Sequence, residues 1–374
     1  MKISSNFESG NIEVISVENP LDIRLNIRKD TNSDFMQWFY FRLQGAQDFP
    51  CLIHIMNAGS SFVPEGWEQY NVCASYDKKT WFRVQTDFDG EKMTIHHTPK
   101  RNSVYFAYFA PYSYEKHLEL VHKAQESAEC IVENLGETVE KRDIDMLMIG
   151  EPAETKKTIW VIARQHPGET MASWFMEGFV NRLLDPNDSV SLTLLKKAIF
   201  YVVPHMNIDG AIHGNLRVNS LGVNFNREWK EPSLEKSPEV FHVRNKMDQT
   251  GVDLFLDIHG DEALPYNFIS GTAGIPGFTE KQARNMKIFL DHWLEVCPDF
   301  QTEKGYPEDK PGQANLNIAS KHVAHRFSCL AFTLEMPFKD NKNILEPVYG
   351  WSPKRSEKLG ESVLQAILKV IDSL

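Results

Sequence analysis

Cysteine is scarce in this 374-residue sequence, and its few cysteines form no pattern. They are odd in number, widely spaced and never arranged as CxxC, which argues against a disulfide framework and against a thiolate zinc site. We interpret them as small buried hydrophobic residues. The five positions are Cys51, Cys73, Cys130, Cys297 and Cys329.

Long apolar runs are also missing. No run approaches the roughly 20 residues that a membrane span requires. The N-terminal segment MKISSNFESGNIEVISVENP lacks the apolar core of a signal peptide. Together with the cysteine usage, these absences predict a protein of the reducing cytoplasm with no membrane partner.

Positive charge is in deficit, because 40 Lys and Arg face 51 Asp and Glu and the net charge is −11. Nucleic-acid binding relies on clustered Lys and Arg that release counterions, so this balance argues against a nucleic-acid partner. The 42% hydrophobic and 24% charged composition is typical of a globular protein. The length favours two domains, and we find no internal repeat or low-complexity segment.

The first third of the chain is typical of β structure. Short runs rich in β-branched and aromatic residues recur, separated by turn signals such as Asn57-Ala58-Gly59. This spacing predicts an all-β antiparallel sandwich domain over residues 1–112. The expected strands are Ile12–Val17, Leu21–Ile27, Met36–Leu43, Cys51–Met56, Trp81–Thr86, Lys92–His97 and Val104–Phe109.

Strands and helices alternate in the rest of the chain. This alternation predicts an α/β domain over residues 113–374, with a mixed, mostly parallel sheet flanked by helices. The expected strands are Met146–Ile149, Thr158–Ala163, Ile199–Val203, Leu254–Ile258 and Cys329–Leu334. The expected helices are Tyr114–Gln125, Thr170–Leu184, Glu239–Gln249, Glu280–Val296 and Lys354–Ile371.

The segment His166-Pro-Gly-Glu169 lies where a strand is expected to end and a helix to begin. The apolar run Thr158–Ala163 precedes it, and a helix with an apolar face follows. Open α/β sheets bind ligands at the carboxyl ends of their strands. Imidazole nitrogen and carboxylate oxygen are both zinc ligands, so His166 and Glu169 are candidate metal ligands.

A second histidine follows another buried-strand pattern. The run Asp253–Ile258 leads directly into His259, which is therefore expected at the same edge of the sheet. Two histidines and one glutamate leave zinc a fourth position for water, as a catalytic site requires. Glu262 offers an alternative ligand, because His259 and Glu262 also form an HxxE pair. That assignment leaves His166 and Glu169 without a role.

Glu335 follows a third expected strand, Cys329–Leu334. A carboxylate at the end of a hydrophobic strand is costly unless it faces a cleft or has a partner. In a zinc hydrolase this position suits a general base and acid, whose pKa partial burial raises toward the working range.

A long loop is expected after the strand Ile199–Val203, because turn signals recur between residues 207 and 229. Long loops at the carboxyl edge of a sheet tend to be functional. Arg217 and Arg227 lie in this loop. They are candidates for anion recognition, since a guanidinium binds a carboxylate bidentately.

Five motifs in this chain resemble those of the zinc metallocarboxypeptidases of the carboxypeptidase A (M14) superfamily. The resemblance is closest to the cytosolic carboxypeptidases, including bacterial members, because Gln37-Trp-Phe-Tyr-Phe-Arg42 and Ala107–Tyr114 look like that subfamily's β-domain and its exit. The five motifs are His166-Pro-Gly-Glu169, Asn207-Ile-Asp-Gly210, the Asn215-Leu-Arg217 and Phe225-Asn-Arg-Glu-Trp229 segments, the strand-borne His259, and Thr333-Leu-Glu335.

This resemblance implies a hydrolase that removes residues from the C-terminus of a peptide or protein, through a peptide or isopeptide bond, with one zinc ion per chain. It also implies three zinc ligands, a catalytic glutamate with an arginine that stabilises the oxyanion, and residues that bind the terminal carboxylate of the substrate. The implied residues are His166, Glu169 and His259 for zinc, Glu335 and Arg217 for catalysis, and Asn226, Arg227 and Arg217 for substrate binding. The oligomeric state stays open.

The chain departs from the family pattern at one position and leaves another open. Digestive relatives carry an aspartate two residues before the Asn-Arg pair, where it orients a zinc histidine. Here that place is Asn224, whose amide oxygen can still accept a hydrogen bond but lacks charge. Tyr266 and Tyr306 are the candidates for the mobile tyrosine of the digestive enzymes.

The segment Asn315–His325 is expected to line the pocket for the terminal side chain. Its basic residues, with those just after it, suggest a preference for acidic residues, because the family includes enzymes that remove C-terminal glutamates. The basic residues are Lys321, His322, His325 and Arg326.

Two alternatives stay open at this point. One is a zinc deacylase of small N-acyl amino acids, similar to aspartoacylase, although those relatives have shorter chains. The other is a non-enzymatic module that binds a peptide.

Overall fold

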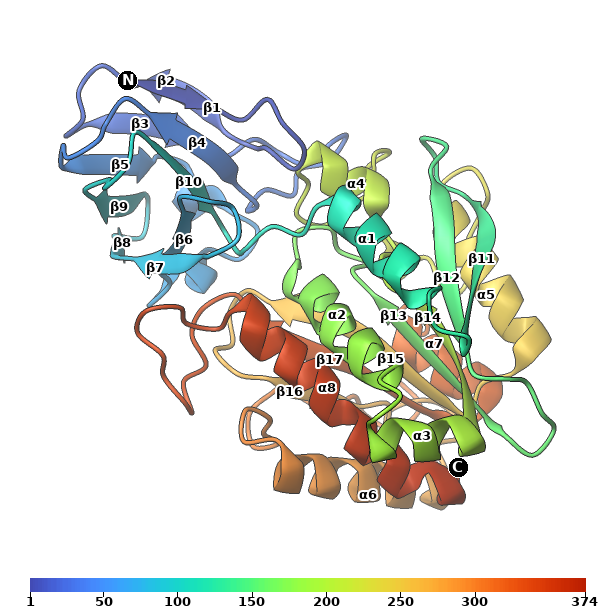
Figure 1. The fold of residues 1–374 in the computed structure, drawn as a ribbon. Coiled ribbons are helices and arrows are strands. Elements are labelled where there is room, and N and C mark those ends of the chain that lie inside the picture. Colours follow the sequence, from blue (N-terminus) through green and yellow to red (C-terminus); the bar gives the residue numbers. More distant parts are fainter.

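The computed structural model describes all 374 residues, with a β-rich N-terminal part followed by an α/β part (Figure 1). Two five-stranded sheets form the N-terminal part, in the orders β1-β4-β10-β6-β7 and β2-β3-β5-β9-β8. Alternate residues of β5 are buried, as expected when one face of a sheet packs on a core. The strands are β1 (Lys2–Ser4), β2 (Glu13–Ser16), β3 (Ile23–Asn26), β4 (Tyr40–Gln44), β5 (Cys51–Ile55), β6 (Val72–Ser75), β7 (Phe82–Val84), β8 (Thr86–Phe88), β9 (Met93–His97) and β10 (Ser103–Ala107), with short 3₁₀ turns η1 (Ala58–Ser60) and η2 (Pro64–Trp67).

The predicted antiparallel sandwich is confirmed, with one parallel pair, β3 with β5. Each expected strand is present, although β4 begins only at Tyr40 and Met36–Phe39 are not in a strand. The sequence patterns missed β1, β6 and β8. β6 is buried on both faces and therefore lacks the two-residue alternation on which strand prediction relies.

A seven-stranded sheet forms the centre of the α/β part, in the order β11-β12-β14-β13-β15-β17-β16. The four central strands, β14, β13, β15 and β17, are parallel to one another, whereas β12 pairs antiparallel with β11 and β14, and β16 pairs antiparallel with β17. The mixed, mostly parallel sheet is thus confirmed. The strands are β11 (Cys130–Glu137), β12 (Asp143–Ile149), β13 (Lys157–Ala163), β14 (Ala198–Val203), β15 (Leu254–Asp261), β16 (Phe268–Ser270) and β17 (Leu330–Pro337).

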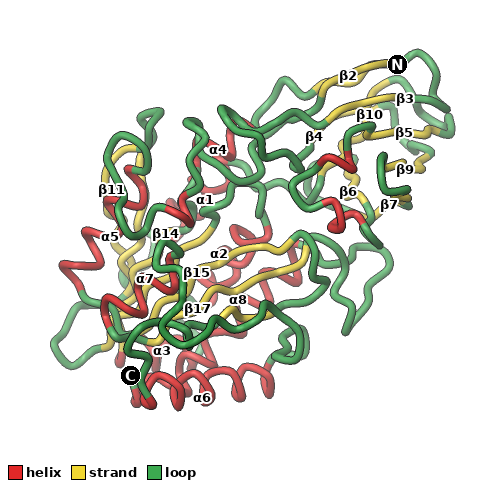
Figure 2. Tube along the Cα trace, turned by 180° about the vertical axis from the view of Figure 1, so that it is seen from behind, coloured by secondary structure: helices red, strands yellow, loops and turns green.

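Helices cover both faces of this sheet (Figures 1 and 2). β13 shows the division, because Ile159 and Val161 belong to one apolar cluster with α1, α2, α3, α6 and α8, whereas Trp160 and Ile162 belong to a second cluster with α5 and α7. The helices are α1 (Tyr114–Ala124), α2 (Met171–Leu183), α3 (Ser189–Lys197), α4 (Ile208–His213), α5 (Pro238–Thr250), α6 (Glu280–Val296), α7 (Ala319–Phe327) and α8 (Pro353–Val370), with turns η3 (Phe225–Arg227) and η4 (Ile371–Ser373).

All five strands and all five helices expected after residue 112 are present within a few residues. β11, β16, α3, α4 and α7 were not expected. β11 lies at the sheet edge with mostly half-exposed residues, and β16 has only three residues. Both are too polar or too short to give a strand pattern. No helix is long and apolar enough to cross a membrane.

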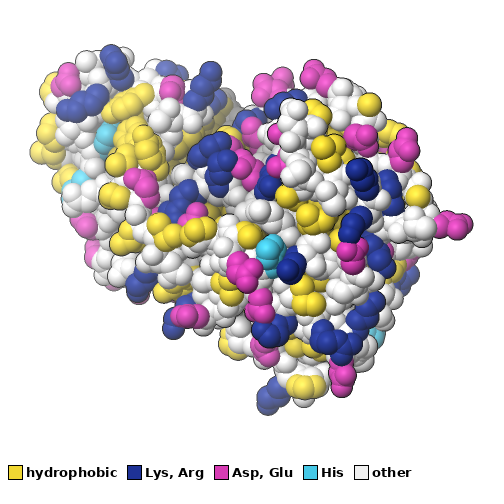
Figure 3. All heavy atoms as spheres, turned by 60° about the horizontal axis from the view of Figure 1, so that its bottom comes forward, with side chains coloured by type: hydrophobic (Ala, Val, Ile, Leu, Met, Phe, Trp, Pro, Cys, Tyr) yellow, Lys and Arg dark blue, Asp and Glu magenta, His cyan; other side chains and the backbone are white.

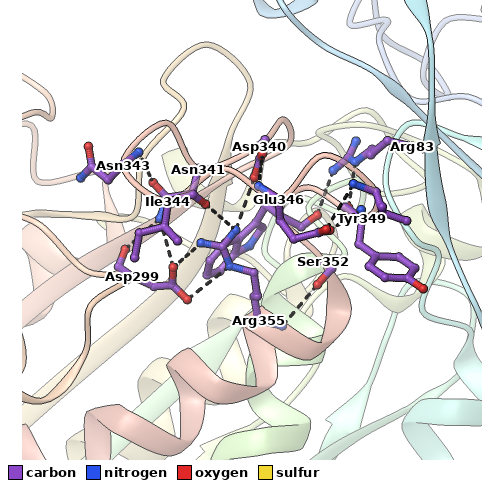
Figure 4. A network of polar contacts seen from close by, with 12 residues as sticks. Arg83, Asp299, Asp340, Asn341, Asn343, Ile344, Glu346, Tyr349, Ser352 and Arg355 are labelled. Atoms are coloured by element: carbon purple, nitrogen blue, oxygen red, sulfur yellow. Dashed lines mark hydrogen bonds and ion pairs between the residues drawn. The ribbon is translucent and has the colours of Figure 1, made fainter.

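Arg83 of β7 joins the two parts of the chain through the segment 338–352 (Figure 4). Its guanidinium donates to the carbonyl oxygens of Phe338, at 2.8 Å, and Trp351, at 2.9 Å. On the other side of this segment, Arg355 of α8 pairs with Asp299 and Asp340. The larger apolar cluster also contains residues of both parts, so they share one continuous core.

Candidate active site

Three adjacent parallel strands bring the site residues to one edge of the sheet. β15 carries His259 and β17 carries Glu335, and these two residues are paired in the strand register. His166 and Glu169 lie in the turn that follows β13, the neighbour of β15 on its other side. The carboxyl ends of parallel strands meet at the same edge, so residues almost 170 positions apart become neighbours.

His166, Glu169 and His259 form a buried cluster in which one potential ligand atom from each lies within 4.8 Å of the others. The Nδ1 atom of His166 lies 2.6 Å from Glu169 Oε1, and the Nδ1 atom of His259 lies 2.8 Å from Glu169 Oε2. The two Nδ1 atoms are 3.2 Å apart. Two imidazole nitrogens and a carboxylate thus converge on one point.

The outer nitrogens of both imidazoles have fixed partners. His259 Nε2 lies 3.0 Å from the carboxylate of Asp257, which can only accept. His166 Nε2 lies 3.1 Å from Asn224 Oδ1, an atom that also accepts from the backbone N–H of Asn226. Both Nε2 atoms must therefore donate, which turns both Nδ1 atoms toward the centre of the cluster as potential metal ligands. The expected contact of Asn224 with a candidate ligand is present, and this donor set fits zinc.

The electrostatics of the cluster are strongly coupled. Burial alone would raise the pKa of Glu169, but the two imidazoles outweigh it and hold that pKa well below its usual range. Burial lowers the pKa of His166 to about 4, and the nearby charge of Arg217 adds to this. The carboxylates of Asp257 and Glu169 overcome burial at His259 and raise its pKa well above its ordinary value.

Glu335 lies beside this cluster, only 7% exposed, and its Oε2 atom has no hydrogen-bond partner. Burial raises its pKa well above the usual range, and the neighbouring acidic groups add to this effect. Glu262 is also buried and lines the same cavity, and burial raises its pKa to about 8. Glu262 therefore favours the protonated form near neutral pH.

Asn226 and Arg227 project from the turn η3. The side-chain oxygen of Asn226 accepts from the backbone N–H of Ala319, at 2.9 Å, which leaves its NH₂ group as a donor. Arg227 donates through Nη1 to the carbonyl oxygen of Asn226, at 2.7 Å. Burial and the charge of Arg217 lower the pKa of Arg227. An amide NH₂ and a guanidinium side by side suit a carboxylate.

Arg217 lies in the loop between α4 and η3. Its guanidinium makes no hydrogen bond or ion pair, and it sits over the aromatic ring of Phe62, 4.7 Å from the ring centroid. Phe62 belongs to the N-terminal part of the chain. The guanidinium donors of Arg217 are thus free for a ligand.

One cavity of about 270 Å³ collects these groups. Six of the seven predicted site residues line it, and His259 lies behind Glu169. Tyr306 also lines it and donates to Asp261, whereas Tyr266 does not reach it. Glu262, Lys321 and Thr333 also belong to motifs or segments to which the sequence points, whereas Ser270 belongs to the unexpected β16 and carries no such signal. The lining residues are His166, Glu169, Arg217, Asn226, Arg227, Gly260, Glu262, Ser270, Tyr306, Ile318, Lys321, Thr333 and Glu335.

The basic residues before β17 lie on α7, and among them only Lys321 lines the cavity. Its ammonium group forms an ion pair with Asp309. The other basic residues face elsewhere: Arg326 pairs with Asp248, and His325 contacts the carbonyl oxygen of Pro276. The expected cluster of basic residues in the pocket is therefore reduced to a single lysine.

Comparison with known proteins identifies the family. The family model described as zinc carboxypeptidase matches residues 115–359, about two thirds of the chain. The chain belongs to the zinc carboxypeptidases. A second model, the cytosolic carboxypeptidase N-terminal domain, matches residues 3–109 of this carboxypeptidase. It is therefore a zinc-dependent hydrolase acting on peptide bonds, and the non-enzymatic alternative is set aside.

Solved structures of related proteins are closely similar to this carboxypeptidase. A metallo-carboxypeptidase from Burkholderia cenocepacia is 46% identical, with a TM-score of 0.97 over 99% of both chains. A metallo-carboxypeptidase from Pseudomonas aeruginosa, in complex with (2-guanidinoethylmercapto)succinic acid, is 45% identical, with a TM-score of 0.97 over 100% of both chains. Cytosolic carboxypeptidase 6 of Caenorhabditis elegans is 25% identical, over 99% of this chain and 87% of the relative.

Charge is mixed on the surface of this carboxypeptidase. On the face shown in Figure 3, acidic and basic side chains are interspersed, and no broad area carries one sign. This face therefore carries no surface-wide field of one sign.

Proposed function

We propose that the cavity binds the C-terminal residue of a peptide and that its residues cleave the bond before that residue. The observation that carries this proposal is the meeting of a two-His, one-Glu cluster, a buried unpartnered Glu335 and three cationic side chains in one cavity. His166, Glu169 and His259 would hold one zinc ion. When bound, such an ion polarises a carbonyl group and makes water more acidic.

Glu335 acts as the general base and acid in this proposal. The raised pKa of Glu335 suits this task, because a carboxylate that is too weak a base cannot take a proton from water. Glu335 accepts a proton from the attacking water at its unpartnered Oε2 and then delivers it to the departing amine nitrogen.

The two arginines hold opposite sides of the scissile bond. The free donors of Arg217 bind the carbonyl oxygen as negative charge develops on it, an interaction worth about 3–4 kcal/mol in other acyl hydrolases. Arg227 and the NH₂ group of Asn226 bind the terminal carboxylate. Because Glu262 favours the protonated form, the cavity is more cationic than its formal charges suggest.

We further propose that Lys321 selects acidic C-terminal side chains. Lys321 lines the cavity and already pairs with a carboxylate, that of Asp309, which supports this assignment. A substrate carboxylate would exchange with Asp309 for the ammonium group.

A mixed peptide library tests both steps. We expect wild type to remove single C-terminal residues, to favour glutamate over leucine, and to leave C-terminal amides intact, as read by mass spectrometry. Branched glutamyl tails in the library separate peptide from isopeptide cleavage, and an N-acyl amino acid separates this activity from that of a deacylase.

Two variants test carboxylate binding and acidic selectivity separately. Arg227→Ala should raise KM by about 10–100-fold, because a charged hydrogen bond is lost, and should reduce the preference for free acids over amides. Lys321→Met should lower the preference for glutamate and spare leucine. An unchanged ratio of glutamate to leucine cleavage in Lys321→Met would rule out the acidic pocket and leave the carboxypeptidase mechanism intact.

Residues 1–112 and 113–374 are the two domains in this proposal, supported by the break between β10 and α1 and by the limits of the two family models. We place the enzyme in the cytoplasm. All five cysteines are free and buried, as expected in a reducing compartment.

A further inference from the structure

The loop that carries Arg217 is bound along its length by the N-terminal β-domain. Ser9 donates through its backbone N–H to the carbonyl oxygen of Ile212, at 2.9 Å. Asn11 donates through Nδ2 to the carbonyl oxygen of Gly214, also at 2.9 Å. Because these bonds come from another domain, the path of the loop depends on how the two domains are joined.

The contacts continue on both sides of Arg217. The backbone N–H of Thr31 donates to Asn215 Oδ1, at 2.9 Å, and Asn32 donates through Nδ2 to the carbonyl oxygen of Ser220, at 3.0 Å. The segment after β3 therefore runs along the loop that carries Arg217, from residue 215 to residue 220.

Asp30 is the centre of this contact. Its carboxylate accepts three backbone N–H groups of the loop: Leu216 at 2.7 Å, Arg217 at 2.7 Å and Val218 at 3.3 Å. Asp30 is only 3% exposed. One buried carboxylate thus fixes the backbone at Arg217 and on both sides of it.

The β-domain also contacts the guanidinium of Arg217 directly. The guanidinium carbon lies 4.7 Å from the ring centroid of Phe62 and 5.6 Å from that of Phe35. These two rings pack edge to face, with centroids 4.8 Å apart. Aromatic faces attract a cation without occupying its N–H donors. Arg217 is therefore held in place while its donors stay available.

We propose that Asp30 is a positioning residue, supplied by the β-domain, that aligns Arg217 with the reacting carbonyl, and that Phe62 completes this function at the guanidinium. The β-domain then forms part of the catalytic apparatus rather than a separate appendage. This inference rests on the proposed role of Arg217 at the oxyanion. Asp30 and Phe62 act through Arg217 and do not touch the substrate carbonyl.

A double-mutant cycle between Asp30 and Arg217 tests the proposal. Wild type, Asp30→Asn, Arg217→Ala and the double variant are compared by kcat and KM on the peptide that wild type cleaves best, with zinc content and Tm measured for each. Asparagine replaces one acceptor oxygen by an NH₂ group, so it cannot accept all three N–H groups.

We expect Asp30→Asn to lower kcat by about 10–50-fold with little change in KM, since transition-state contacts act on kcat. Arg217→Ala should lower kcat/KM by about 10²–10³-fold. The kcat/KM of the double variant should be no more than about threefold lower than that of Arg217→Ala, because without the Arg217 side chain Asp30 has no group to position. Multiplicative losses in the double variant would overturn the inference.

Phe62→Ala provides a second route if Asp30→Asn does not fold. Phe62 is 41% exposed, so its removal spares the core, and its loss should lower kcat by several-fold in wild type but not in Arg217→Ala. The matched control is Asp34→Asn in the same segment, because the Asp34 side chain is 95% exposed and pairs only with Lys29. That control should leave kcat unchanged.

The outcomes separate this inference from the proposed function. Arg217→Ala could lose activity while Asp30→Asn and Phe62→Ala both stay fully active. That result would show that Arg217 takes part in the mechanism and that Asp30 and Phe62 do not. A fully active Arg217→Ala would instead remove Arg217 from its proposed role, and the inference with it.

Discussion

The candidate metal cluster of His166, Glu169 and His259 and the loop that carries Arg217 lie at the same cavity but are held in different ways. His259 lies within β15, and His166 and Glu169 lie in the turn directly after β13, so one sheet fixes all three. Arg217 lies in a loop whose backbone is fixed by Asp30, 187 residues earlier in the chain. The first region is built within the α/β part, and the second exists only where the β-rich part contacts the α/β part.

This difference suggests that the two regions respond differently to changes at the contact between the two parts of the chain. The hydrogen bonds of the sheet, together with Asp257 and Asn224, fix the cluster, so it should tolerate changes at the domain interface. The position of Arg217 should respond to those changes, because the β-domain supplies its backbone acceptor and its aromatic contacts. Loss of interface contacts should therefore lower turnover before it lowers zinc content.

The largest expected effect comes from removing a cluster residue. His259→Ala should no longer bind one zinc ion per chain, and its activity should fall by at least ~10³-fold, because two ligands cannot hold a catalytic zinc ion. Zinc analysis, activity and circular dichroism check this prediction together. A variant that keeps zinc and activity would show that the cluster is not the metal site.

The next effect comes from the loop. Arg217→Lys keeps the charge but loses the planar fork of donors, and we expect kcat to fall about 10²-fold while zinc content stays at the wild-type level. Steady-state kinetics with zinc analysis measures both. Loss of zinc in this variant would contradict the independence of the two regions.

A smaller effect is expected when the partner of a cluster residue gains charge. In Asn224→Asp, a carboxylate should accept from His166 Nε2 and strengthen its Nδ1 as a ligand. We expect zinc affinity to rise by about tenfold, as measured by competition with a chelator. Equal or weaker affinity would show that charge at this position does not control metal binding.

The smallest effect on activity concerns a carboxyl group outside both regions. Glu239 of α5 is 1% exposed, neither oxygen has a partner, and burial raises its pKa to about 8, above the ordinary 4.5. A raised carboxyl pKa means that its contribution to stability is complete below pH ~4.5 and is lost as the pH rises through ~8.

The stability advantage of Glu239→Gln over wild type should therefore grow between pH 6 and pH 9, by an amount on the order of 2–3 kcal/mol. Thermal unfolding at the two pH values measures the difference, and kcat should not change. A constant Tm difference across this range would contradict the raised pKa.

The fold was largely predictable because its main elements carry strong local patterns. Thr158–Ala163 and Leu254–Ile258 are continuous apolar runs, and each leads directly into a histidine. A parallel sheet brings the carboxyl ends of such strands together, so the strand positions alone predict that His166, His259 and Glu335 are neighbours. Their roles remain proposals for experiment.

The remaining features depend on contacts that no local pattern encodes. Asp30 looks like an ordinary turn residue in the sequence, because its three donors lie about 186 residues away. The basic residues after Asn315 look like a pocket lining, but α7 turns all except Lys321 away from the cavity. Ser270 lies on a strand too short to be expected.

The most direct test of the central claim is the turnover of zinc-loaded Glu335→Gln. Glu335 is the buried, unpartnered carboxyl beside the cluster, and glutamine keeps its size but cannot take a proton from water. We expect one zinc ion per chain and a wild-type KM range, with kcat reduced by at least ~10³-fold. Turnover at the wild-type rate with zinc bound would contradict the mechanism.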